Sequence, residues 1–175
     1  MKTVFFDIDT QFDFVNPAGA LYVPGSEFII PNVARLNRYA AERGIPLIST
    51  TDAHTETDPE FAFWPHHCVA GTLGQRKPEP TLVGQIVLTK QSVDCFTIPG
   101  LPALLDDLGA ERCVVYGVVT EICVKHAVFG LLKTGRYVEL VTDAVKSLDE
   151  AAAAQMLRDL AAQGGVATTV DAVCR

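Results

Sequence analysis

Short runs rich in β-branched residues alternate along this chain with stretches that carry apolar residues at helical spacing. Six runs read as strands: Thr3–Ile8, Pro46–Thr51, Ile86–Thr89, Arg112–Val118, Tyr137–Val141 and Gly165–Val170. Several of them are apolar on both faces, which is typical of strands covered by helices on each side of a parallel sheet. The alternation therefore predicts an α/β fold with a largely parallel sheet.

The stretches between the strands have helix signals at both ends. Asp149 is placed to cap the last of them, and glycines follow all four as stop signals. The predicted helices are Pro31–Arg43, Leu101–Leu108, Thr120–Lys133 and Glu150–Gln163. A long irregular stretch, Asp52–Gln85, remains, and loops of that length in a compact domain are usually functional. At 175 residues the chain is expected to form one domain, residues 1–175.

Charge and composition exclude several classes of partner. The net charge of −7 leaves no basic stripe for a phosphate backbone, so nucleic acid is not an expected partner. No segment approaches the roughly 20 apolar residues of a membrane span. The N-terminus lacks the apolar stretch of a signal peptide, which predicts a cytoplasmic protein. Five cysteines without a C-x-x-C pair are expected to be free thiols.

Reactive side chains follow four of the predicted strands. Asp9 comes after the first strand, Asp52 and His54 after the second, Lys90 after the third and Cys123 after the fourth. In an open α/β sheet, ligands bind beyond the carboxyl ends of the strands. These residues are therefore expected to share one site.

Cys123 stands in the stretch "YGVVTEICVKHA", where an apolar run gives way to a helix. A lone helical cysteine is more often a small core residue than a nucleophile. If Thr120 caps this helix, however, Cys123 is its third residue, where free N–H groups and the helix dipole favour a thiolate. An acid and an amine beside it would complete an activated nucleophile. Lys90 can supply the amine, whereas Asp7, Asp9 and Asp13 leave the identity of the acid open.

The long loop offers ligands for a metal ion. Asp52, His54 and His67 supply one carboxylate and two imidazoles, a set that suits zinc, iron or manganese. The alternative interpretation is a polar surface loop.

Three stretches of the chain resemble the isochorismatase-like cysteine hydrolases. "DIDTQFDF" matches the D-x-Q-x-D-F opening of that family, Lys90 matches its lysine, and "GVVTEICV" matches its G-[VI]-x-[ST]-x-x-C-V block. The resemblance implies a three-layer α/β/α sandwich with six strands. It also implies that Asp9 is the catalytic acid and base, that Lys90 supports it, and that Cys123 is the nucleophile.

Within the family the loop is similar to that of the nicotinamidases. Their D-x-H pair matches Asp52 and His54, and their W-P-x-H-C stretch matches residues 64–68. The resemblance implies a divalent transition metal, zinc being the first choice and iron or manganese the alternatives, held by Asp52, His54 and His67. A further histidine that many nicotinamidases carry is missing here, so Glu60 or Asp58 would serve, and Glu60 is preferred.

The resemblance implies an activity as well, the hydrolysis of nicotinamide to nicotinate and ammonia through a thioester on the cysteine. Phe14 and Trp64 would sandwich the pyridine ring. A cis peptide bond between Val118 and Val119 would aim the Val119 N–H at the oxyanion, together with that of Cys123. Homo-oligomers are typical of the family. Two other interpretations remain: an amidase for an N-carbamoyl or maleamate-type substrate, and a non-catalytic metal-binding or interaction protein on the same scaffold.

Overall fold

A parallel β-sheet runs through the centre of the protein. The computed structural model describes all 175 residues. The strands are β1 (Thr3–Ile8), β2 (Leu47–Asp52), β3 (Ile86–Lys90), β4 (Arg112–Val118), β5 (Tyr137–Lys146) and β6 (Val166–Thr168). Every neighbouring pair is parallel, in the order β3-β2-β1-β4-β5-β6. The predicted α/β fold with six strands is confirmed.

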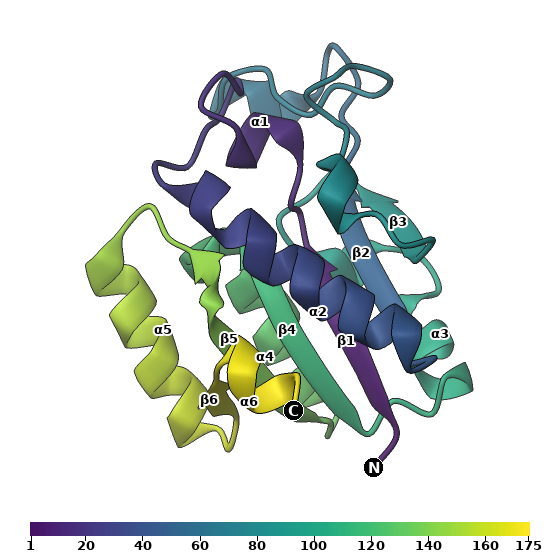
Figure 1. The fold of residues 1–175 in the computed structure, drawn as a ribbon. Coiled ribbons are helices and arrows are strands. Elements are labelled where there is room, and N and C mark those ends of the chain that lie inside the picture. The colour runs from purple at the N-terminus through teal and green to yellow at the C-terminus, as the bar shows by residue number, and fades with distance from the viewer.

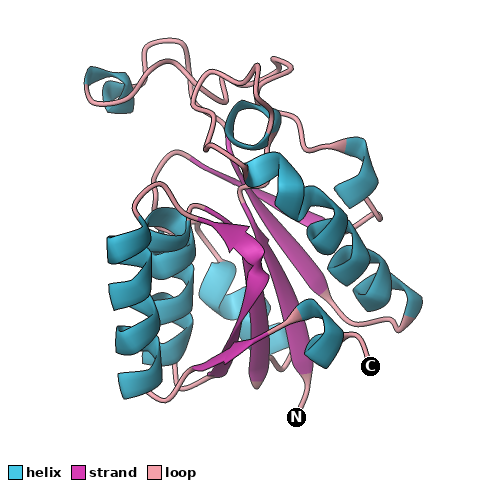
Figure 2. Ribbon diagram, turned by 60° about the vertical axis from the view of Figure 1, so that its left-hand side comes forward, coloured by secondary structure: helices cyan, strands magenta, loops and turns pink.

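Helices cover both faces of the sheet and make three layers (Figures 1 and 2). On one face, α3 (Leu101–Asp107), α4 (Lys125–Lys133) and α5 (Glu150–Ala162) bury an apolar cluster against the strands. On the other, α2 (Ile30–Glu42) and α6 (Val170–Val173) bury a second cluster. The central strands β1 and β4 are buried on both sides, which explains their nearly continuous apolar runs. None of the helices is both long and apolar enough to cross a membrane.

The structure differs from the predicted elements at two strands and one helix. β5 continues to Lys146, beyond the predicted end at Val141, because a register shift near Gly117 lets it pair with β4 again. The last strand stops at Thr168, and Val170 begins α6 instead of ending the strand. The predicted helix Thr120–Lys133 is divided into a π-helical turn, η5 (Thr120–Val124), and α4.

Gly117 is required where β4 passes the end of β1. Its φ of 119° is a conformation that L side chains rarely adopt, and a Cβ there would lie 2.1 Å from the carbonyl oxygen of Ile8. The absence of a side chain thus lets the strand that leads to Cys123 approach the strand that leads to Asp9.

The long segment between β2 and β3 lies beyond the carboxyl ends of the strands, at the top of Figure 1. It carries the 3₁₀ turns η2 (Pro59–Ala62) and η3 (Glu79–Thr81), while α1 (Phe12–Val15), η1 (Ser26–Ile29) and η4 (Cys95–Thr97) lie in other connections. The backbone N–H of Phe12 bonds to the carbonyl of Arg76, and that of Asp13 to the carbonyl of Gly74. A buried ion pair of 2.8 Å between Lys77 and Asp7 adds a further attachment. The segment is therefore fastened to β1 itself, at Asp7, and to the residues that follow it.

Candidate active site

Asp9, Lys90 and Cys123 meet at the carboxyl ends of three strands. Lys90 Nζ lies 2.7 Å from Asp9 Oδ2 and 3.9 Å from Cys123 Sγ. Asp9 follows β1 and Cys123 follows β4, the two adjacent strands between which the strand order reverses. That reversal is where open α/β sheets bind ligands. The structure brings together the three residues that the sequence placed at separate strand ends.

The backbone at Asp9 decides which acid faces the cysteine. Asp9 has a φ of 50°, a left-handed conformation that aspartate tolerates better than most residues. The strand alternation is broken there, and the Asp9 carboxylate accepts a hydrogen bond of 2.7 Å from Thr50 Oγ1 beside Lys90. Asp7 instead contacts Asn37 of α2 and pairs with Lys77.

The Asp13 side chain is hydrogen-bonded to two loops. Its carboxylate accepts hydrogen bonds from the backbone N–H groups of Cys68, at 2.7 Å, and Ala20, at 3.0 Å. Neither Asp7 nor Asp13 is thus available to the cysteine, and Asp9 is the acid of the cluster that lies at the site.

Cys123 is in the π-helical turn, not in the third position of a helix capped by Thr120. The residue before the turn is Val119, which makes no side-chain capping bond, so the predicted cap is wrong. The Val118–Val119 peptide bond is cis, as the resemblance implies. Burial raises the pKa of the Cys123 thiol well above its ordinary value, and the charge of Lys90 offsets this only in part. The thiol is therefore the resting form, contrary to the thiolate expected from the helix end alone.

Asp9 and Lys90 lie in contact beside Cys123, and each affects the pKa of the other. Burial raises the pKa of Asp9, while Lys90 acts in the opposite direction. Burial alone would lower the pKa of Lys90, but the negative charges around it raise that pKa well above its usual range. A protonated Lys90 thus faces a carboxylate that can accept the thiol proton.

Asp52, His54 and His67 come together as a candidate metal site. Their ligand atoms lie within 4.8 Å of one another, and all three residues are buried. Asp52 Oδ1 bonds to Lys90 at 2.5 Å, and Oδ2 lies 3.8 Å from His54 Nε2. That Nε2 atom is buried without a hydrogen-bond partner. An orphaned imidazole nitrogen beside a carboxylate and a second imidazole is the donor set that a divalent transition metal fits.

Glu60 and Asp58 approach opposite nitrogens of His54. Asp58 Oδ2 lies 3.0 Å from Nδ1, whereas Glu60 Oε2 lies 4.0 Å from Nε2, the nitrogen that also faces Asp52. A carboxylate that holds one ring nitrogen fixes the tautomer and leaves the other free for a metal. Burial disfavours the imidazolium of His54, but Asp52 and Asp58 outweigh it and raise its pKa to about 9.

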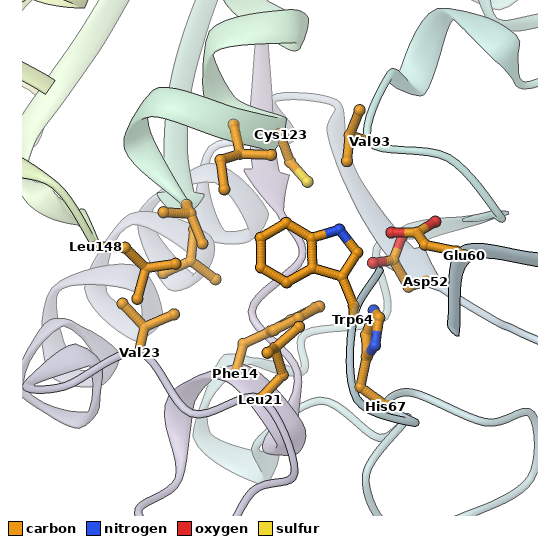
Figure 3. A pocket seen from close by; sticks show the side chains of 13 residues that line it. Phe14, Leu21, Val23, Asp52, Glu60, Trp64, His67, Val93, Cys123 and Leu148 are labelled. Carbon is orange, nitrogen blue, oxygen red and sulfur yellow. The ribbon is translucent and has the colours of Figure 1, made fainter. Parts of the chain in front are cut away.

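An apolar pocket extends from Cys123 to three of the candidate ligands, Asp52, Glu60 and His67 (Figure 3). The sulfur of Cys123 points into it, the Trp64 indole crosses its middle, and Asp52, Glu60 and His67 stand along one side. No lysine or arginine lines it. The lining residues are Phe14, Leu21, Val23, Asp52, Glu60, Trp64, His67, Val93, Val118, Val119, Ile122, Cys123 and Leu148.

The sequence had assigned no role to Gln11, which fixes Asp52. Its Nε2 donates to the carbonyl of Asp52 at 2.8 Å, and its Oε1 accepts from the N–H of Asp52 at 2.6 Å. Gln11 belongs to the quoted stretch "DIDTQFDF", but a neutral amide carries no chemistry by which composition could single it out.

A family model describes this combination of sheet and site. The isochorismatase domain matches residues 3–172. The chain belongs to the isochorismatase family. This agrees with the resemblance of the "DIDTQFDF" and "GVVTEICV" stretches and with the positions at which the structure places them.

Several proteins that are similar to this chain are amidases. The zinc-bound pyrazinamidase of Pyrococcus horikoshii superposes with a TM-score of 0.88 at 30% identity, covering 97% of this chain and 99% of that one. The nicotinamidase of Escherichia coli is 25% identical over 81% of this chain and 82% of its own. A probable inactive nicotinamidase of Arabidopsis thaliana is 25% identical over 73% and 71%. The N-carbamoylsarcosine amidase of an Arthrobacter species is 25% identical over 73% and 53%.

Proposed function

We propose that this chain is a cysteine amidohydrolase that converts nicotinamide to nicotinate and ammonia. The observation that carries the proposal is one pocket with Cys123, backed by Asp9 and Lys90, at one side and a metal ligand set at another. The similarity of the chain to a pyrazinamidase and a nicotinamidase supports the same assignment.

Asp9 acts first as base and then as acid in this reaction. It takes the thiol proton of Cys123 as the sulfur attacks the amide carbon, and it returns that proton to the departing ammonia. The thioester is then hydrolysed by a water that Asp9 deprotonates. Lys90 keeps the carboxylate and the forming thiolate in place through its contacts of 2.7 and 3.9 Å.

The backbone N–H groups of Val119 and Cys123 receive the oxyanion. Both residues line the pocket next to the sulfur. Loss of such a donor costs on the order of 3 kcal/mol of transition-state stabilisation in comparable sites.

Asp52, His54 and His67 would hold a divalent metal ion, zinc being the first choice, with Glu60 as the additional carboxylate. When bound, the ion supplies a Lewis acid that can accept the ring nitrogen of a pyridine amide. Phe14 and Trp64 supply the aromatic faces between which a flat ring would stack.

The main competing substrates of this kind of enzyme are anionic. N-carbamoylsarcosine and maleamate each carry a carboxylate, which needs a cationic partner when it is buried. The pocket offers no arginine or lysine, and Lys90 is already paired with Asp9 and Asp52. This charge distribution favours a neutral aromatic amide.

Ammonia release from nicotinamide, maleamate and N-carbamoylsarcosine tests the proposal. We expect nicotinamide to be the preferred substrate and Trp64→Ala to raise its KM about fivefold, since a stacked ring contributes about 1 kcal/mol. Phe63→Ala is the matched control, because Phe63 is adjacent but 85% exposed. Faster turnover of either anionic amide, or an unchanged KM in the Trp64 variant, would contradict the proposed substrate.

Retention of the metal separates the roles of Asp58 and Glu60. Asp58→Ala should weaken metal affinity about 10- to 100-fold, because the carboxylate that orients His54 is lost. Glu60→Gln should weaken it as well, whereas Glu56→Gln, an exposed acid of the same loop, should not. Metal content after dialysis against a graded chelator measures this. Full retention by the Asp58 variant would show that His54 does not depend on this contact.

A further inference from the structure

Glu121 lies two residues before Cys123, and its side chain reaches the connection between β5 and α5. Oε1 accepts hydrogen bonds from the backbone N–H groups of Leu148, at 2.9 Å, and Asp149, at 2.8 Å. The second oxygen, Oε2, is buried without a hydrogen-bond partner. The carboxylate therefore serves this one connection and no other part of the chain.

The connection, residues 147–149, is attached to α5 at Asp149, whereas Leu148 has no such attachment of its own side chain. Leu148 is 48% exposed, so its own burial fixes it only weakly. Asp149 does not line the pocket, and its carboxylate caps α5 by accepting from the N–H groups of Ala151 and Ala152. Hydrogen bonds to an ionised carboxylate are stronger than those between neutral groups. Glu121 is thus the link between this connection and the turn that carries the nucleophile.

Leu148 forms the side of the pocket that lies across from the metal ligands. In Figure 3 it stands with Val23 on one side of the Trp64 indole, while Asp52 and Glu60 stand on the other. Leu148 and Val23 have no polar side-chain atoms. The wall that they form can therefore select substrates by size but not by hydrogen bonding.

We infer that Leu148 limits the size of the substrate ring and that Glu121 is the positioning residue that holds it there. The inference rests on the proposed function: with the amide at Cys123 and the ring nitrogen toward the metal ligands, the ring edge made of carbons 4 and 5 faces Leu148. The enzyme then accepts small aromatic amides and rejects those with a bulky group on that edge, such as a phenyl group at carbon 5. An apolar wall discriminates between substrates by about 10- to 200-fold for a change as small as one methylene.

Turnover of nicotinamide and 5-phenylnicotinamide by three variants tests this assignment. Leu148→Ala and Glu121→Ala should each raise kcat/KM for 5-phenylnicotinamide, relative to nicotinamide, by about tenfold or more. Glu150→Ala is the matched control, because Glu150 is an exposed acid at the start of α5 that does not line the pocket. It should leave the ratio unchanged.

Glu121→Gln keeps an oxygen acceptor and should shift the ratio less than Glu121→Ala. It also serves if the alanine variant fails to fold. A changed ratio in Leu148→Ala with none in either Glu121 variant would overturn the positioning role. An unchanged ratio in Leu148→Ala would overturn the wall itself.

Alkylation of Cys123 gives a readout that needs no amide turnover. The rate for the bulky N-phenyliodoacetamide, relative to iodoacetamide, should rise in Leu148→Ala and Glu121→Ala and stay constant in Glu150→Ala. If the wild type does not hydrolyse nicotinamide but the labelling ratios behave as stated, the proposed substrate is wrong and the wall stands. If nicotinamide is hydrolysed and the labelling ratios do not move, the wall is wrong and the proposed function stands.

Discussion

Cys123→Ala is expected to abolish amide hydrolysis, with a loss of at least about 10⁴-fold in kcat, because no other group at the site can form the thioester. The other acid and base groups would remain, but they lack an attacking atom. The fold should survive, since replacing the sulfur of one buried residue by hydrogen costs about 1 kcal/mol. Ammonia release and a thermal unfolding curve measure the two effects separately.

Selective alkylation identifies the same residue by an independent route. Iodoacetamide at neutral pH should label Cys123 ahead of Cys68, Cys95, Cys113 and Cys174. Cys68, Cys95 and Cys113 are buried and do not line the pocket that reaches Cys123, and Cys113 lies within β4. Cys123 combines a pocket with a base, Asp9, and a cation, Lys90.

Cys174 is the cysteine that competes most directly with Cys123 for the alkylating agent, because it is the one cysteine that is not buried. Cys174→Ser therefore serves as the control and should leave both turnover and the labelling of Cys123 unaltered. Peptide mass spectrometry at partial modification decides the order. Earlier labelling of another cysteine, or residual turnover by Cys123→Ala, would falsify the assignment of the nucleophile.

Hydrophobic patterning was enough to predict the fold. The six strands and four main helices lie close to where β-branched runs and helical spacing place them, because the central strands β1 and β4 are buried on both faces and show a clear apolar pattern. Because ligands bind beyond the carboxyl ends of the strands in such sheets, the sequence also predicted that four residues share one region: Asp9, Asp52, Lys90 and Cys123. β5 was predicted too short, because its continuation depends on the register shift beside Gly117, a contact between strands that no local pattern records.

The orientation of single side chains could not be predicted from spacing. Strand alternation places Asp7 and Asp9 on the same face, and only the left-handed backbone at Asp9 separates them. The choice between Glu60 and Asp58 likewise depends on which nitrogen of His54 each approaches. Leu148 is 25 residues from Cys123 in sequence and reaches the pocket through the fold.

Metal-loaded enzyme is expected to hydrolyse nicotinamide with a kcat/KM about 100-fold higher than that for benzamide. This ratio corresponds to a difference of about 2.7 kcal/mol in transition-state free energy. The two amides share their ring shape and reactive group, but benzamide has no ring nitrogen to face the ligand set of Asp52, His54 and His67. Both should stack equally well on Phe14 and Trp64. Any preference for nicotinamide over benzamide then reports an interaction of the ring nitrogen at the metal ligands, and not a contact with the apolar wall formed by Leu148.

His54→Ala is the variant that tests this arrangement, because Asp52 also contacts Lys90 at 2.5 Å and its loss would disturb the catalytic charges. The His54 variant should lose metal on dialysis and raise the KM for nicotinamide, while the alkylation rate of Cys123 stays near that of the wild type. Removing the metal from the wild type with a chelator should narrow the preference over benzamide in the same way, and adding zinc back should restore it.

The two amides also separate orientation of the substrate from activation of the nucleophile. If the ligand set served to activate Cys123 or water, metal removal would slow nicotinamide and benzamide by the same factor, and His54→Ala would slow alkylation. The distances favour orientation, because the cation next to Cys123 Sγ is Lys90, at 3.9 Å. Equal turnover of nicotinamide and benzamide by the metal-loaded enzyme would exclude the orienting role and would favour a different amide as the substrate of this pocket.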